Sequence, residues 1–117
     1  MSNIERKISG VEKLFNNILP TIYPHITNIQ ILKNDTDGYR YPEYDLIIDT
    51  DLPNTVTKDE YWDNEFWETN QMFDYHYMND VIMPELLEYF SIKDREFNRL
   101  VHIYNKDNKH IISSVNL

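Results

Sequence analysis

Apolar side chains recur every three or four positions near the start of the chain, at Ile4, Ile8, Val11, Phe15 and Ile18. This spacing predicts an amphipathic helix over residues 2–19, because positions three and four apart lie on one face of a helix. Ser2 and Glu5 have the spacing of a capping box at its start. Pro20 lacks the backbone N–H that a helix interior needs, so the helix is expected to end there.

Two pairs of shorter apolar segments are each interrupted by turn-forming residues. Residues 26–33 and 44–50 are separated by a run that contains Asn, Asp, Thr and Gly, and residues 97–104 and 110–115 by a run of Asn, Lys and Asp. Asn, Asp and Gly are residue types that turns favour. Each pair therefore predicts a β-hairpin.

A helical pattern returns between the two hairpins. Thr57 and Glu60 have capping-box spacing. At about 100° per residue, one narrow arc holds the apolar residues Trp62, Phe66, Phe73, Tyr77 and Val81. The pattern predicts a helix over residues 58–82. Pro84 is expected to kink or restart this helix, which continues over residues 85–90.

The predicted order of elements is α-β-β-α-(α)-β-β. Hairpins favour antiparallel pairing, and the intervening helices favour one helical layer on a face of the sheet. We therefore predict a two-layer α+β fold, in which an antiparallel four-stranded sheet of two hairpins carries two to three helices on one face. A chain of 117 residues can bury a core without disulfides or a structural metal, so residues 1–117 are expected to form a single domain.

Negative charge is concentrated in the middle of the chain. Residues 34–90 hold 15 of the 20 acidic residues but only two of the 11 basic ones, Arg40 and Lys58, so their formal charge is −13. The whole chain carries −9, because both flanking segments are mildly basic. No cationic stripe is present to neutralise phosphates, so direct binding of nucleic acid is not expected. A protein with a basic surface is the natural complement.

Composition restricts the compartment and the available chemistry. The chain has no Cys, which excludes disulfides and thiolate metal sites and fits a reducing compartment. The first residues lack the apolar stretch of a signal peptide, and the aliphatic runs are too short to span a bilayer. The expected location is therefore the cytoplasm, with no membrane partner. The absence of Ala and the presence of only two Gly indicate an AT-rich genome, a style shared with many phage accessory proteins.

The first candidate site is an acidic row on the second predicted strand. Glu43, Asp45, Asp49 and Asp51 occupy alternate positions, so they share one face of a strand. This face permits three interpretations: a solvated surface, a protein-binding surface, or a site at which Asp45, Asp49 and Asp51 hold Mg²⁺ or Ca²⁺. The third would make the chain a metal-dependent phosphoryl-transfer or hydrolytic enzyme, but the upstream Gly-Ser element of nucleotidyltransferases is missing.

The second candidate site is the acidic helix between the hairpins. Among its carboxylates, those of Asp59, Asp63, Glu65, Glu68 and Asp74 are the candidates for partner binding. Trp67 and Tyr75 lie outside the apolar arc of this helix, and Trp and Tyr are typical anchors of protein interfaces. Together with Asp45, Asp49 and Asp51, these residues form the predicted partner-binding surface. The alternative is that another part of the chain buries the aromatic side chains and that the acids are merely solvated.

The sequence contains no signature of a catalytic centre or a cofactor. With only Gly10 and Gly38 there is no phosphate-binding loop, and His25, His102 and His110 have no ligand spacing. The predicted function is a non-enzymatic protein-binding protein. Its sharpest form is a phage-encoded inhibitor whose carboxylates stand in for phosphates at a basic, nucleic-acid-binding site of a host protein. Besides the metal-dependent enzyme, the alternative is a small structural or assembly protein that forms a homodimer or larger homo-oligomer.

Overall fold

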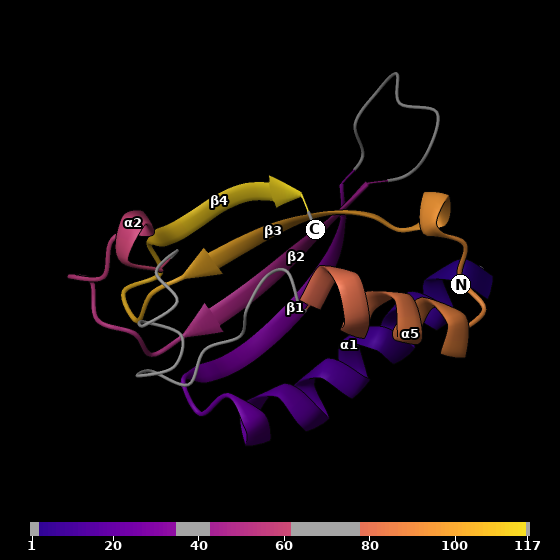
Figure 1. Ribbon diagram of the computed structural model, residues 1–117, viewed down its shortest axis with the longest axis horizontal. Helices are drawn as coiled ribbons and strands as arrows, with labels where there is room; N and C mark the ends of the chain where they lie inside the picture. The colour runs from indigo at the N-terminus through magenta and orange to yellow at the C-terminus, as the bar shows by residue number, and fades with distance from the viewer. Residues whose placement is uncertain (1–2, 35–42, 62–77, 117) are drawn as a thin grey trace.

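The computed structural model describes residues 3–34, 43–61 and 78–116. Four strands form one sheet in the order β1-β2-β3-β4. Their bounds are Ile26–Asn34 for β1, Glu43–Thr50 for β2, Asn98–Tyr104 for β3 and His110–Asn116 for β4. The helices are α1 (Asn3–Ile22), α2 (Lys58–Tyr61) and α5 (Met83–Tyr89), with a π-helical turn η1 (Met78–Ile82) and a 3-10 turn η2 (Asp94–Glu96). The predicted α+β class is confirmed (Figure 1).

The sheet is mixed, so the prediction of a fully antiparallel sheet is wrong. The β1–β2 and β3–β4 pairs are antiparallel, as the two predicted hairpins require, but β2 and β3 are parallel. The segment between them carries the chain from the end of β2 back to the end of the sheet where β2 began (Figure 1). Such a crossover makes the next strand parallel. Turn-forming residue types in the sequence predict each hairpin locally, whereas the direction of one hairpin relative to the other depends on the crossover.

Helix α1 extends beyond its predicted end. Pro20 lies inside the helix, and the Tyr23 N–H still donates to the Leu19 carbonyl at 2.7 Å, so the proline does not break it. Ile18, expected in the buried stripe, is 41% exposed. Ile8, Val11 and Phe15 of the predicted stripe are buried, and Ile4 is partly buried. Leu19, which flanks the stripe, is also buried.

The crossover between β2 and β3 is helical at both described ends. The Glu60 N–H donates to Thr57 Oγ1 at 3.2 Å, which confirms one bond of the predicted capping box. Pro84 lies in the first turn of α5, where a missing N–H removes no hydrogen bond, so the predicted restart is also confirmed. Val81, expected in the buried arc, is 37% exposed. The rest of that arc, within residues 62–77, lies outside the described residues.

One continuous core lies between the sheet and the helices. Alternate residues of β2 are buried, at Tyr44, Leu46 and Ile48, because strand side chains point to opposite faces in turn. The same cluster continues into the helical layer and the crossover. It includes Val11, Phe15, Tyr61, Met83, Leu87 and Phe97.

The outer edge of β1 is closed by polar side chains of α1. The Ile31 N–H donates to Glu12 Oε2 at 2.7 Å, and the Ile29 N–H donates to Asn16 Oδ1 at 2.9 Å. Asn16 Nδ2 in turn donates to the Ile29 carbonyl at 2.7 Å. An open edge strand is a template for pairing with another chain. These three bonds satisfy the outward N–H and carbonyl of Ile29 and the outward N–H of Ile31, so α1 protects this edge.

Stability is expected to fall at alkaline pH because of Tyr44. Its side chain is buried, and burial, with smaller contributions from Glu5 and Glu96, raises the pKa of its phenol. Below the unfolded-state pKa of about 10 the associated stability is fully present. It is lost as the pH rises from that value through the raised folded-state pKa, because only the unfolded chain can then ionise freely.

Urea titrations at a series of alkaline pH values would measure this loss. Tyr44→Phe should flatten the fall in the free energy of unfolding, since phenylalanine does not titrate. Tyr89→Phe, at a residue that is 78% exposed, is the matched control and should leave the slope as in the wild type. If the free energy of unfolding falls equally steeply with pH in wild type and Tyr44→Phe, then Tyr44 does not cause the loss of stability.

Candidate functional site

The helices bury one face of the sheet, and the alternate set of side chains remains accessible on the other. Within the described ranges, no helix buries this second set. We call it the open face. Its members on β1, β2 and β3 are Asn28, Gln30, Leu32, Asn34, Glu43, Asp45, Ile47, Asp49, Asn98, Leu100, His102 and Tyr104.

Strand β2 places the predicted acidic row on the open face. Glu43, Asp45 and Asp49 are partly exposed, whereas the residues between them point into the core or are apolar. Asp51 lies just after β2, and its Oδ1 is 2.6 Å from His25 Nδ1, so it has a partner of its own at the end of the sheet. The open face as defined carries three carboxylates and no Lys or Arg.

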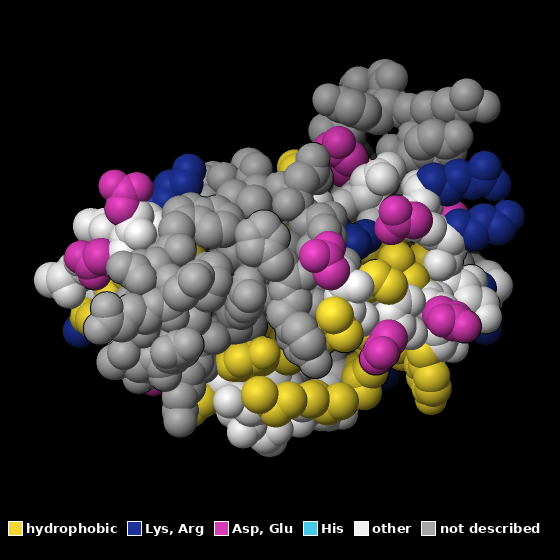
Figure 2. Space-filling view, viewed as in Figure 1, with side chains coloured by type: hydrophobic (Ala, Val, Ile, Leu, Met, Phe, Trp, Pro, Cys, Tyr) yellow, Lys and Arg dark blue, Asp and Glu magenta, His cyan; other side chains and the backbone are white. Residues whose placement is uncertain are grey.

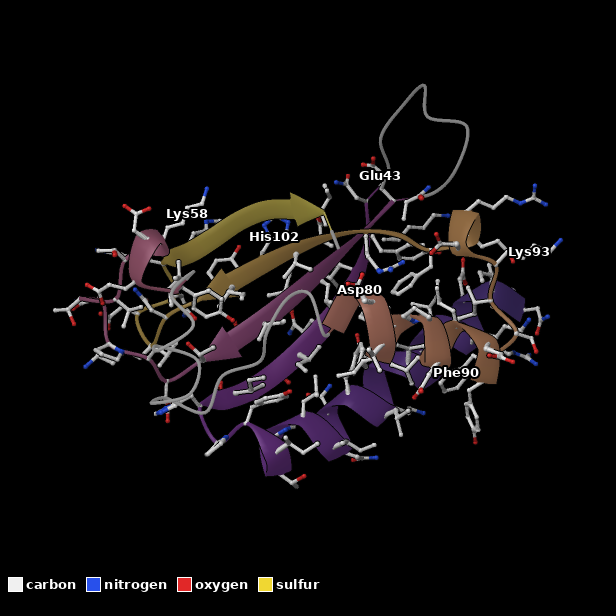
Figure 3. The ribbon with its side chains drawn as sticks, in the orientation of Figure 1. Glu43, Lys58, Asp80, Phe90, Lys93 and His102 are labelled. Atoms are coloured by element: carbon white, nitrogen blue, oxygen red, sulfur yellow. The ribbon has the colours of Figure 1, made fainter. Side chains whose placement is uncertain are left out.

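The parallel pairing of β2 and β3 brings His102 beside this row, and His110 lies one strand further on, on β4. His102 Nε2 lies 3.2 Å from Asp45 Oδ1, and His102 is labelled on β3 in Figure 3. The ring of His110 lies 4.3 Å from that of Tyr104 and 5.5 Å from that of His102, between centroids. The sequence did not predict these contacts. Asp45 and His102 are 57 positions apart, and no motif or periodicity connects them.

His102 is poorly placed for acid–base catalysis. Its side chain is 15% exposed, Nε2 is engaged with Asp45, and Nδ1 is buried with no hydrogen-bond partner among the described residues. A general base must reach the proton it removes directly or through one water, and neither ring nitrogen is free to do so. A neutral imidazole carries one proton, on Nε2 or on Nδ1. On Nε2 the proton can be donated to Asp45, whereas on the buried Nδ1 it would lack an acceptor. The pair therefore orients Asp45.

The three aspartates of the proposed metal site are each engaged separately. Asp45 contacts His102, Asp51 contacts His25, and Asp49 Oδ2 accepts a long hydrogen bond of 3.5 Å from Asn28 Nδ2. Mg²⁺ and Ca²⁺ require several oxygens arranged around one point. Among the described residues, no group of three or more His, Cys, Asp or Glu side chains could hold a metal ion. The metal-dependent alternative thus gains no support from this part of the chain.

The remaining predicted binding residues lie away from the open face or outside the described ranges. Asp59 is exposed on α2, at the end of the sheet where β4 begins (Figure 1). The structure does not describe the other members of the predicted surface: Asp63, Glu65, Trp67, Glu68, Asp74 and Tyr75. The prediction for those six residues stays a prediction.

Comparison with known proteins does not assign a function. No family model matches the chain, and neither curated proteins nor solved structures include a significant match. Within the described ranges, every helix is too short or too polar to cross a membrane. The functional argument therefore depends on the geometry of the open face.

Proposed function

We propose that this chain is a non-enzymatic protein-binding protein whose open face binds a basic surface of its partner. One observation carries the proposal: the open face holds Glu43, Asp45 and Asp49 and no Lys or Arg. A surface that is only solvated usually intersperses both signs of charge. Leu32, which is 50% exposed, and Tyr104 add apolar and aromatic contact area of the kind that interfaces use.

Asp45 is held in place before a partner binds by its 3.2 Å contact with His102. Asp49 is held only weakly, by a hydrogen bond of 3.5 Å from Asn28, and both carboxylates project from a central strand of the sheet. Preorganised groups lose less conformational entropy on binding than free side chains. This rigidity favours recognition of cationic side chains over simple solvation.

The partner class that fits is a protein with a nucleic-acid-binding site. Such sites present Lys and Arg to phosphates, and carboxylates on a rigid face can occupy the same cations. In its sharpest form, the proposal is a phage-encoded inhibitor that acts in the host cytoplasm. The competing nucleic acid and this chain would then exclude each other from the partner.

Affinity purification from the source cells, followed by titration of the recovered partner, tests the proposal. We expect a basic partner whose affinity weakens about tenfold or more as salt rises from low to several times physiological strength, because exposed charges are screened. Asp49→Asn should weaken binding several-fold. Added nucleic acid should displace the chain.

Asp107→Asn is the matched control for Asp49→Asn. Both aspartates accept a hydrogen bond from an asparagine amide, since Asp107 Oδ2 is 2.9 Å from Asn54 Nδ2, and both substitutions remove one negative charge. Asp107 lies in the turn between β3 and β4, which is bonded to the segment after β2, and it does not belong to the open face, so its substitution should leave affinity unchanged. Affinity that ignores ionic strength, or equal losses in the two variants, would refute binding through the open face.

A further inference from the structure

A second surface lies on the helical side of the molecule, between α1 and the η1–α5 segment. The two helical segments enclose an open groove with a volume of about 680 Å³. Its walls are apolar. Leu14, Ile18 and Ile22 come from α1, and Ile82, Leu86 and Tyr89 from the facing segment.

The groove gathers most of the exposed large apolar side chains of the described residues. Ile18 is 41% exposed, Ile22 is 56% exposed and Tyr89 is 78% exposed, and all three line it. Val81 is 37% exposed and directly precedes Ile82, which also lines the groove. Contiguous exposed apolar surface of this kind marks interaction sites in soluble proteins.

The close approach of α5 to α1 closes one end of the groove. A Cβ added at Gly10 would lie 2.7 Å from the ring of Phe90, so the glycine permits this contact at its usual cost to helix stability. Phe90 is labelled at the end of α5 in Figure 3. At the same end, Lys7 Nζ donates to the Ser91 carbonyl at 2.9 Å. The two walls are therefore fixed relative to each other without filling the groove between them.

The charged residues of the η1–α5 wall are all acidic. Glu85 lines the groove and Glu88 is exposed on the same helix, and residues 78–90 contain no Lys or Arg. Figure 2 shows carboxylates directly beside the apolar side chains of this region. An occupant with an apolar stripe and a cationic edge is complementary to this arrangement.

We propose that the groove binds an amphipathic α-helix of a protein partner. Its apolar stripe would contact Ile18, Ile22 and Tyr89, and Lys or Arg along one edge would face Glu85 and Glu88. Two helices packed side by side present a groove into which a third can pack, and helix-in-groove recognition uses apolar anchors at helical spacing. The acidic wall disfavours anionic lipids and acidic helices. This surface is separate from the open face and does not depend on the function proposed for it.

The test uses a fluorescein-labelled synthetic peptide of about 18 residues, with Leu at helical spacing and Lys along one flank. Fluorescence anisotropy with the intact protein should give saturable binding that weakens with salt. A peptide with Glu in place of every Lys should bind at least about tenfold more weakly. Ile22→Ser in the protein should weaken binding of the Lys peptide about tenfold. Glu85→Gln combined with Glu88→Gln should weaken it several-fold.

Leu32→Ser is the matched control for Ile22→Ser. Both residues are about half exposed, at 50% and 56%, so both substitutions should leave the fold intact, which circular dichroism melting checks. Leu32 lies on the open face, so its substitution should leave peptide affinity unchanged, as should Asp49→Asn. Conversely, loss of the basic partner in Asp49→Asn with retained peptide binding would separate the two surfaces.

Three outcomes would overturn the proposal. The first is an absence of saturable binding, or equal affinity for the Lys and Glu peptides. The second is equal affinity of wild type and Ile22→Ser for the Lys peptide. The third is a dimer in light scattering that Ile22→Ser dissociates, which would assign the groove to a second copy of the chain.

Discussion

Replacing Phe97 with alanine is expected to lower the free energy of unfolding by about 3–5 kcal/mol, the usual range for a buried phenylalanine. The side chain of Phe97 is 0% exposed, and its ring packs against Tyr44 with 5.3 Å between centroids. The guanidinium of buried Arg99 lies 5.7 Å from the same ring. The substitution therefore leaves a cavity and also removes an aromatic neighbour from a buried cation.

Urea denaturation followed by circular dichroism measures this loss. Small domains are stable by about 5–15 kcal/mol, so the variant is expected to be close to its unfolding threshold. Phe97→Leu, which keeps most of the volume, should cost much less. Tyr89→Ala, at an exposed aromatic residue, should stay within about 0.5 kcal/mol of wild type. A Phe97→Ala variant within that same margin would show that the packing around Phe97 is not as described.

Replacing Asn16 with alanine is expected to lower the free energy of unfolding by about 2 kcal/mol, since two hydrogen bonds to Ile29 are lost and partly buried backbone groups are left unsatisfied. The higher helix propensity of alanine offsets roughly half a kcal/mol of this cost. The freed edge of β1 should also promote pairing between chains. Light scattering at rising concentration should therefore detect more self-association in Asn16→Ala than in wild type.

Asn17→Ala separates the hydrogen-bonding effect from helix propensity. Asn17 is the next residue of α1 and is exposed, so the same substitution there changes propensity alone and should stabilise slightly. The difference between the two variants isolates the contribution of the Asn16 bonds. If both variants have the same stability and remain equally monodisperse, then α1 does not protect the β1 edge.

Local patterns in the sequence were sufficient to locate the strands and their faces. The alternation along the second strand put Glu43, Asp45 and Asp49 on one face, and the structure confirms this, with Tyr44, Leu46 and Ile48 in the core on the other face. Alternation works here because the side-chain period of a strand is two, whatever surrounds it. The capping bond at Thr57 and the restart at Pro84 were also predictable, because each depends only on residues within one helical turn.

Contacts between distant segments were not predictable from these patterns. The spacing of apolar residues in α1 placed Ile18 in the core, but the helix is covered on only part of that stripe, so Ile18 lies at the groove. Periodicity gives the direction in which a side chain points and does not give the width of the neighbour that covers it. Nor does any local signal indicate that Glu12 and Asn16 would hydrogen-bond to β1.

The sequence by itself determined an acidic, Cys-free chain with two hairpins, an amphipathic first helix and a carboxylate row on one face of β2. The tertiary structure alone decided that β2 and β3 run parallel, which brings His102 to Asp45, and that α5 meets α1 at Gly10 to leave an apolar groove with an acidic wall. The physical reason is that backbone propensity and side-chain periodicity act within a few residues. The crossover direction and the fit between helices depend on packing across the whole core.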